Sequence, residues 1–290
     1  MSMNLTAHPE IMGQGRKRAG WIRCALGVVL LLCAFAAAPA LARRKKKVTG
    51  PPADLPGHIN YLAHQLYGVP LDSATPITSQ IQTLILNHLQ EWFASGAAQD
   101  AKSNEPLDVR VRQQIEDAFS ELHYPLDGKA AVFMQSWKGG QLIGAGYTLG
   151  WPDFRTVNVL ALYEYQARKA RFLTLTHFVP RTDLRYAFLP PATNGILRFI
   201  VYGLRLGMSQ PRLTAILYAF DGSKLYPLWE IHNAYDGKLQ VAPDKVTLRY
   251  LKENEYVQYE ERGQKPPRHE AIYKVTPQGL ALVTDHEIPF

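Results

Sequence analysis

The interpretation of this chain depends on residues 195–232, GILRFIVYGLRLGMSQPRLTAILYAFDGSKLYPLWEIH. Shifted copies of this stretch lie on both sides of it. An ungapped shift of 55 residues toward the N-terminus gives nine identities in 38 positions, including Gly140 on Gly195. Typical amino-acid frequencies would give about two or three identities. The same shift toward the C-terminus gives a weaker match, with Tyr273 on Tyr218. The sequence therefore predicts three units of about 55 residues.

Hydrophobic residues alternate with a period of two from residue 129 onward, which is typical of strands. Glycine-containing dipeptides separate the alternating runs and offer the positive φ that tight hairpins need. We therefore expect a mainly antiparallel β domain over 129–290, with about four strands in each unit. The strands expected in the first unit are 129–137, 141–149, 156–165 and 170–178, and the expected turns are Gly139-Gly140, Asn194-Gly195, Asp221-Gly222 and Asp236-Gly237.

A helical period precedes the β domain, over residues 58–123. Ile77, Ile81 and Ile85 belong to one apolar stripe at steps of three and four residues, and Pro76 suits the first turn of that helix. A second amphipathic helix is expected from about Asp108. The fold class predicted is therefore α+β, with a helical arm packed against the β domain.

The segment LYAFDGSKLYPLWE, residues 217–230, resembles the blade signature of quinoprotein-like β-propellers, in which Ala, Asp and Trp mark the last two strands of a blade. Ala219, Asp221 and Trp229 have that spacing, whereas Leu225 replaces the glycine of the family. The neighbouring units have threonine at the position of the tryptophan, so the resemblance covers the single hairpin 214–230. It implies a blade-like shape and carries no implication of quinone binding.

Two further architectures remain open, because three blades are fewer than the four to eight that usually close a propeller ring. A β-trefoil is also built from three four-stranded units. The third possibility is a single curved sheet clasped by the helices.

The N-terminal residues have the organisation of a signal peptide over 1–42, with basic residues, an apolar run from Cys24 to Phe35 and a cleavage site at Ala40-Leu41-Ala42. We therefore expect export to the periplasm or the medium. The alternative is an uncleaved helix that anchors the protein in the inner membrane. A basic and proline-rich linker is expected over 43–57, before the helical arm.

Charge and cysteine content exclude several functions. Both cysteines, Cys24 and Cys33, lie in the leader, so the exported chain would have no thiol for catalysis or metal binding. The first 47 residues hold nine of the 32 basic residues and one of the 25 acidic ones, which leaves a formal net charge of −1 from Val48 onward. We therefore expect no nucleic-acid partner, and membrane contact only through the leader or the Arg43–Lys47 tail.

No catalytic motif nominates an active site, and Gly144-Ala145-Gly146 indicates close backbone packing within a strand. The 55-residue shift makes His177, His232 and Glu287 equivalent, each at the end of the last strand of its unit. A threefold arrangement would bring them together as ligands of a divalent transition metal. The alternative is that they cap separate strand ends, and no cofactor is expected.

Large aromatic residues are the candidates for ligand binding, namely Trp137, Trp151, Trp229 and Tyr202. Such residues line faces that bind sugars or peptides, and they are also common packing elements of β units. The function expected is a non-enzymatic binding or interaction protein of the cell envelope, with an envelope protein or a glycan as partner. The alternatives are a periplasmic hydrolase or metal-dependent enzyme, and a structural subunit of an envelope assembly with an exposed apolar patch.

Overall fold

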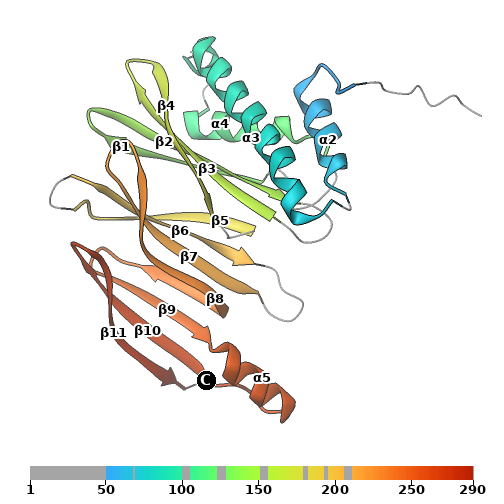
Figure 1. Ribbon diagram of the computed structural model, residues 1–290. Coiled ribbons are helices and arrows are strands. Elements are labelled where there is room, and N and C mark those ends of the chain that lie inside the picture. Colours follow the sequence, from blue (N-terminus) through green and yellow to red (C-terminus); the bar gives the residue numbers. More distant parts are fainter. Residues whose placement is uncertain are drawn as a thin grey trace, which may run out of the picture. The chain divides into compact units, whose positions relative to one another are not determined.

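The computed structural model describes residues 50–67, 69–99, 105–122, 129–150, 156–178, 182–192, 195–205 and 211–289. Over these residues the helical arm precedes eleven antiparallel strands, in agreement with the expected α+β class (Figure 1). Pro51–Phe290 form one compact unit. The expected signal peptide, residues 43–49 of the expected linker and Trp151 lie outside the described residues. No helix in the described part is long and apolar enough to cross a membrane.

The helical arm contains α2 (Leu55–Gln65), α3 (Leu71–Ala94), the short 3-10 helix η2 (Ala97–Gln99) and α4 (Leu107–Ala118). Two boundaries differ from those expected. Helix α2 begins inside the segment expected as linker, because the Asp54 carboxylate accepts a hydrogen bond from the Gly57 N–H at 2.9 Å and caps the helix. Helix α3 begins at Leu71, so Pro76 lies inside the helix and not in its first turn.

The apolar stripe of α3 is buried along most of its length, as its spacing predicts, and Ile77 is partly buried. Ile81 and Ile85 have no exposed surface and pack in one cluster with residues of α2, α4 and the first sheet. Phe93, near the end of α3, packs against Tyr163 of that sheet with 5.2 Å between ring centroids. Burial of this stripe attaches the helical arm to one face of the sheet.

The first sheet matches the first predicted unit, with every strand boundary within one residue of its expected position. Its order is β1 (Ala130–Trp137), β2 (Gly140–Gly150), β3 (Thr156–Gln166) and β4 (Lys169–Phe178), all antiparallel. Lys138 and Gly139 take positive φ in the first hairpin, and Ala167 and Arg168 do so in the last. The last turn contains no glycine, so its residue types did not indicate it.

The second sheet has seven strands and joins the regions in which two further units were expected. Its strands are β5 (Thr182–Leu189), β6 (Leu197–Arg205), β7 (Arg212–Phe220), β8 (Leu225–Val241), β9 (Lys245–Leu251), β10 (Arg268–Thr276) and β11 (Gly279–Ile288), paired in chain order, and α5 (Glu253–Glu261) lies between β9 and β10. The two open sheets agree with a mainly antiparallel β domain, but they do not confirm the repeat count or the blade organisation.

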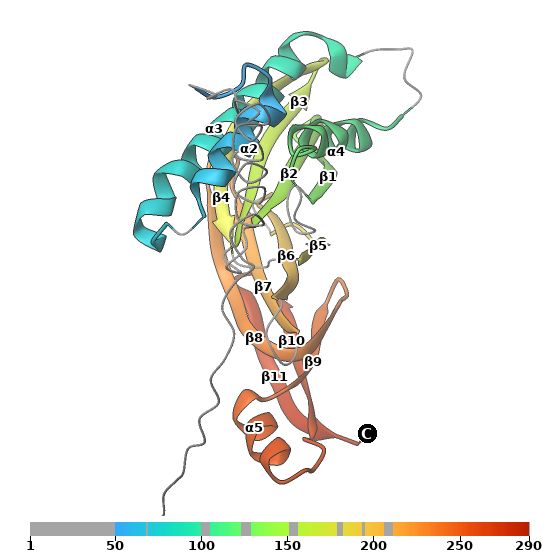
Figure 2. The same ribbon diagram turned by 90° about the vertical axis from the view of Figure 1, so that its right-hand side faces the viewer.

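Strand β8 is shared by two parts of the second sheet (Figure 2). It pairs with β7 between Leu225 and Tyr235, and with β9 between Tyr235 and Val241. The expected hairpin at Asp236-Gly237 is therefore wrong. Asp236 does take a positive φ of 42°, but the chain bends there and continues as the same strand.

The two sheets pack against each other through the face of the first sheet that is opposite the helices. Phe133 and Leu142 of that face join Phe199 of β6 in one cluster. The other face of β6 and β7 packs on β9 through residues such as Leu217 and Val246. Strand β7 is consequently buried on both faces.

Candidate functional site

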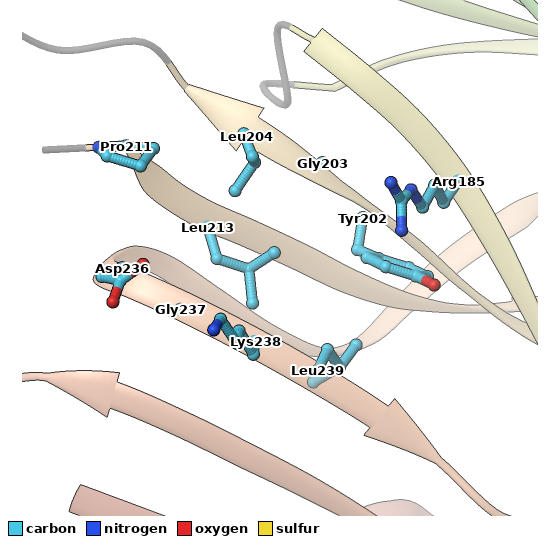
Figure 3. Close-up of a pocket in the computed structure, with 10 residues that line it drawn as sticks. All are labelled: Arg185, Tyr202, Gly203, Leu204, Pro211, Leu213, Asp236, Gly237, Lys238 and Leu239. Atoms are coloured by element: carbon cyan, nitrogen blue, oxygen red, sulfur yellow. The ribbon is translucent and has the colours of Figure 1, made fainter. Parts of the chain in front are cut away.

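A hollow of about 250 Å³ lies where β6, β7 and the bend of β8 meet (Figure 3). Four of its lining residues are large and apolar or aromatic, and the others are charged residues, glycines and one proline. The lining consists of Arg185, Tyr202, Gly203, Leu204, Pro211, Leu213, Asp236, Gly237, Lys238 and Leu239.

The floor of the hollow is formed by Tyr202, Leu204, Leu213 and Leu239. Leu204 and Leu213 are paired across β6 and β7, so they belong to the same face of the sheet. Figure 3 shows Tyr202, Leu213 and Leu239 around the same space. Gly237 permits this geometry, because a Cβ atom on it would lie 2.6 Å from the Cβ atom of Leu213. The bend of β8 thus lies directly against β7.

The edges of the hollow carry positive charge without a compensating carboxylate. Arg185 of β5 lies opposite Tyr202 in the strand register, and Lys238 lies on β8. Within the described part of the chain, neither side chain has a hydrogen bond or an ion pair. The one acidic lining residue, Asp236, forms an ion pair with Arg268. The hollow therefore offers an apolar floor beside two unpaired cations.

The aromatic residues singled out from the sequence are divided among different places. Tyr202 lines the hollow. Trp137 is 9% exposed and packs against Phe220 between the two sheets, with 5.4 Å between ring centroids. Trp229 packs against Tyr273 at 5.2 Å within the second sheet. Of the three that the structure describes, Tyr202 alone contributes to this hollow, and the other two act as packing elements.

The residues proposed as metal ligands do not come together. The His177 Nε2 atom lies 2.8 Å from Oε1 of Gln82 on α3, whereas the His232 Nε2 atom lies 3.3 Å from the Glu230 carboxylate. Across the described ranges, no three His, Cys, Asp or Glu residues are close enough to hold a metal ion, Glu287 included. His177 lies near the end of β4 in the first sheet, whereas His232 lies in the middle of β8 and Glu287 near the end of β11, both in the second sheet. Partial burial lowers the pKa of His177.

A buried histidine that the sequence did not indicate links α5 to the last strands. His269 of β10 has a side chain 4% exposed, and its Nε2 atom lies 2.7 Å from the Glu255 carboxylate of α5. Its Nδ1 atom is 3.9 Å from Asp285, which is too long for a hydrogen bond. The Tyr250 hydroxyl donates to Asp285 at 2.9 Å, and burial together with this carboxylate raises the pKa of Tyr250. The His269–Glu255 contact links α5 to β10, and the Tyr250–Asp285 hydrogen bond links β9 to β11.

No family model, curated protein or solved structure matches this chain. The function must therefore be inferred from the hollow, its charges and the strands that support it.

Proposed function

We propose that this chain is an exported binding protein of the cell envelope, and that its ligand occupies the hollow between β6, β7 and β8. One observation carries the proposal: Arg185, without a partner in the described part, lies at the edge of an apolar floor, and the unpaired Lys238 lies on the strand that lines it. Ligand sites in proteins combine an apolar lining with a few polar groups that orient the ligand. Burial of an apolar ligand against such a floor contributes about 25 cal/mol for each Å² removed from water.

The size of the hollow limits the ligand. Its volume of about 250 Å³ lies below the range of about 300–1,000 Å³ that is usual for drug-sized ligands. Since a water molecule occupies about 30 Å³ in the liquid, the hollow corresponds to about eight waters, or to a ligand of about ten non-hydrogen atoms. The proposed ligand is therefore a small organic molecule.

The envelope location rests on the sequence of the leader. A basic segment, an apolar run and the small residues at Ala40-Leu41-Ala42 support export. The chain that would remain has no cysteine, so the proposed protein is insensitive to the redox state of its compartment.

We also propose that the β domain consists of three four-stranded units, in which β8 ends the second unit and begins the third. A shift of 55 residues moves the bounds of β2 and β3 onto those of β6 and β7 to within about two residues. A further shift moves β7 onto β10 and the start of β8 onto the start of β11. The helices then cover the first unit. Polar residues such as Lys245, Arg249 and Lys274 are exposed on the last unit, and terminal units of repeat proteins require such polar surfaces.

Binding in the hollow is tested with a neutral apolar probe, 1-octanol, and a chain of residues 43–290, which retains the compact unit. We expect 1-octanol to shift the amide resonances of Gly203 and Gly237 in ¹H–¹⁵N correlation spectra. Leu239→Gln places a polar group on the floor and should abolish the shifts, whereas the matched control Leu282→Gln, on an exposed side chain of β11, should preserve them. Circular dichroism confirms that both variants fold. Shifts that are absent, or confined to residues outside the hollow, would refute the proposal.

A second candidate, a structural subunit of an envelope assembly, is favoured by a set of exposed apolar residues on β8 and β11. Tyr226 and Leu228 are 44% and 37% exposed, and Leu282 and Val283 are 58% and 63% exposed. The two strands meet where a Cβ atom on Gly279 would lie 3.4 Å from that of Leu228. Sedimentation velocity separates the candidates, because assembly predicts self-association that Leu282→Glu with Val283→Glu removes. A monomer at every concentration would leave this candidate without support from self-association.

A further inference from the structure

We infer that the hollow selects an organic monocarboxylate with a short apolar body, and that Arg185 binds the carboxylate. This inference rests on the proposed function, because it names the class of ligand for the same hollow. It follows from three features, namely the charges at the edge, the geometry of Arg185 and the chemistry of the floor.

Among the described side chains nearest the hollow, two positive charges remain without a compensating carboxylate. The Asp236 carboxylate is already paired with Arg268. Arg212, at the start of β7, contacts the Tyr235 hydroxyl and lies 3.8 Å from the Glu253 carboxylate. Arg185 and Lys238 have no such partner among the residues that the structure describes. An anionic ligand would complement both, since opposite charges across a binding site favour association.

Arg185 is placed to bind a carboxylate at the edge of the apolar floor. It is paired with Tyr202 across β5 and β6, so both side chains rise from the same face of the sheet. Figure 3 shows the Arg185 guanidinium beside Tyr202, whereas Lys238, paired with Arg249, leaves β8 on the face opposite to Leu239. A guanidinium offers two parallel N–H donors to a carboxylate, which a single ammonium group cannot do. Arg185 is therefore the principal anchor, and Lys238 adds a longer-range attraction.

The floor restricts the rest of the ligand to apolar groups. Leu204, Leu213 and Leu239 provide no hydrogen-bonding side-chain atom, and burying a second charge against them without a partner would be costly. Inorganic phosphate and dicarboxylates are therefore unfavourable ligands. With about ten non-hydrogen atoms available, octanoate is a suitable probe of the carboxylate class.

The inference is tested with three probes of equal chain length, octanoate, 1-octanol and octylamine, titrated against residues 43–290. Binding is followed at the amide resonances of Gly203 and Gly237. We expect octanoate to bind about tenfold more tightly than 1-octanol, and octylamine to bind most weakly. Arg185→Gln should remove most of the preference for octanoate and leave 1-octanol unaffected. Lys274→Gln, a matched loss of an exposed cation on β10, should change neither affinity.

The outcomes distinguish this inference from the proposed function on which it rests. Equal affinities for octanoate and 1-octanol in the hollow would overturn the carboxylate inference and leave the proposed function intact. A preference for octanoate that persists in the double variant Arg185→Gln and Lys238→Gln would overturn the assignment of these two residues. The absence of any shift in the hollow with all three probes would refute the proposed function itself.

Discussion

Gly144→Ala is expected to destabilise the protein, although alanine normally suits a strand better than glycine does. That intrinsic preference is worth about 0.5–1 kcal/mol in favour of alanine. At this position, however, a Cβ atom would lie 2.0 Å from the Phe133 ring. The ring has little room to move, because its centroid lies 4.8, 5.0 and 5.4 Å from those of Tyr186, Phe188 and Phe199. The packing of the two sheets therefore reverses the usual sign of the substitution.

The expected loss follows from two opposing contributions. Overpacking of a filled core costs about 1–3 kcal/mol, and the intrinsic gain of alanine offsets part of it. We expect the free energy of unfolding to fall by about 1–2 kcal/mol. For a chain of this size the melting temperature should then fall by about 3–6 °C. Urea and thermal unfolding of residues 43–290, followed by circular dichroism, measure both quantities.

A double-mutant cycle identifies the cause of that loss. Phe133→Leu shortens the side chain that meets residue 144, so the cost of Gly144→Ala should be smaller in the Phe133→Leu background. We expect a coupling free energy of about 1 kcal/mol between the two sites. If Gly144→Ala raised the stability, or if the two losses were simply additive, the proposed contact between Phe133 and Gly144 would be refuted.

Three further predictions concern buried or hydrogen-bonded polar groups. Arg198→Lys should lower the free energy of unfolding by about 1–3 kcal/mol in urea titrations, because lysine cannot replace a buried guanidinium that donates to backbone carbonyls on both sides. Since burial lowers the pKa of His177, the folded state favours the neutral ring. The melting temperature should therefore decline as the pH falls below the ordinary value of about 6.5, and less so in His177→Gln, which keeps a polar partner for Gln82. The Asp221 carboxylate accepts hydrogen bonds from backbone N–H groups, including that of Ser223, and these hydrogen bonds hold the pKa of Asp221 well below its usual range. Asp221→Ala should therefore destabilise the folded protein at neutral pH. The difference from the wild type should disappear in strongly acidic solution, as urea midpoints at both pH values would show.

The first sheet could be predicted from the sequence because each of its strands pairs with its neighbour in the chain. The boundaries of β1–β4 follow from the alternation of hydrophobic residues and, in the first hairpin, from a turn glycine, and both signals are local. The prediction that Gly144-Ala145-Gly146 reflects close packing is confirmed, since Phe133 and Tyr186 occupy the space above the two glycines. Local patterns were sufficient here because the pairing partners are sequence neighbours.

The second sheet shows where such patterns are insufficient. Asp236-Gly237 has the composition of a hairpin turn, and Asp236 does adopt a positive φ. The chain reverses or only bends there according to which strand edges are free to pair with the residues that follow. In this sheet β7 and β9 provide those edges. Turn propensity determines the dihedral angles of a residue, but it does not determine the partner of the next strand.

The hollow was largely hidden from sequence analysis for the same reason. Tyr202 was singled out as an aromatic candidate, but Arg185 and Lys238 each resemble an ordinary solvated charge in a strand. Their common environment arises from the register of β5 with β6 and from the bend of β8. The predicted metal site is wrong for a related reason, because the 55-residue spacing of His177 and His232 does not determine which sheet each belongs to, and they lie in different sheets.

A crystal structure of residues 43–290 grown with octanoate tests the central claim most directly. The account predicts one octanoate in the hollow, with its carboxylate at the Arg185 guanidinium and its chain against Leu213 and Leu239. A hollow filled by the protein's own side chains, or octanoate bound only elsewhere, would contradict it.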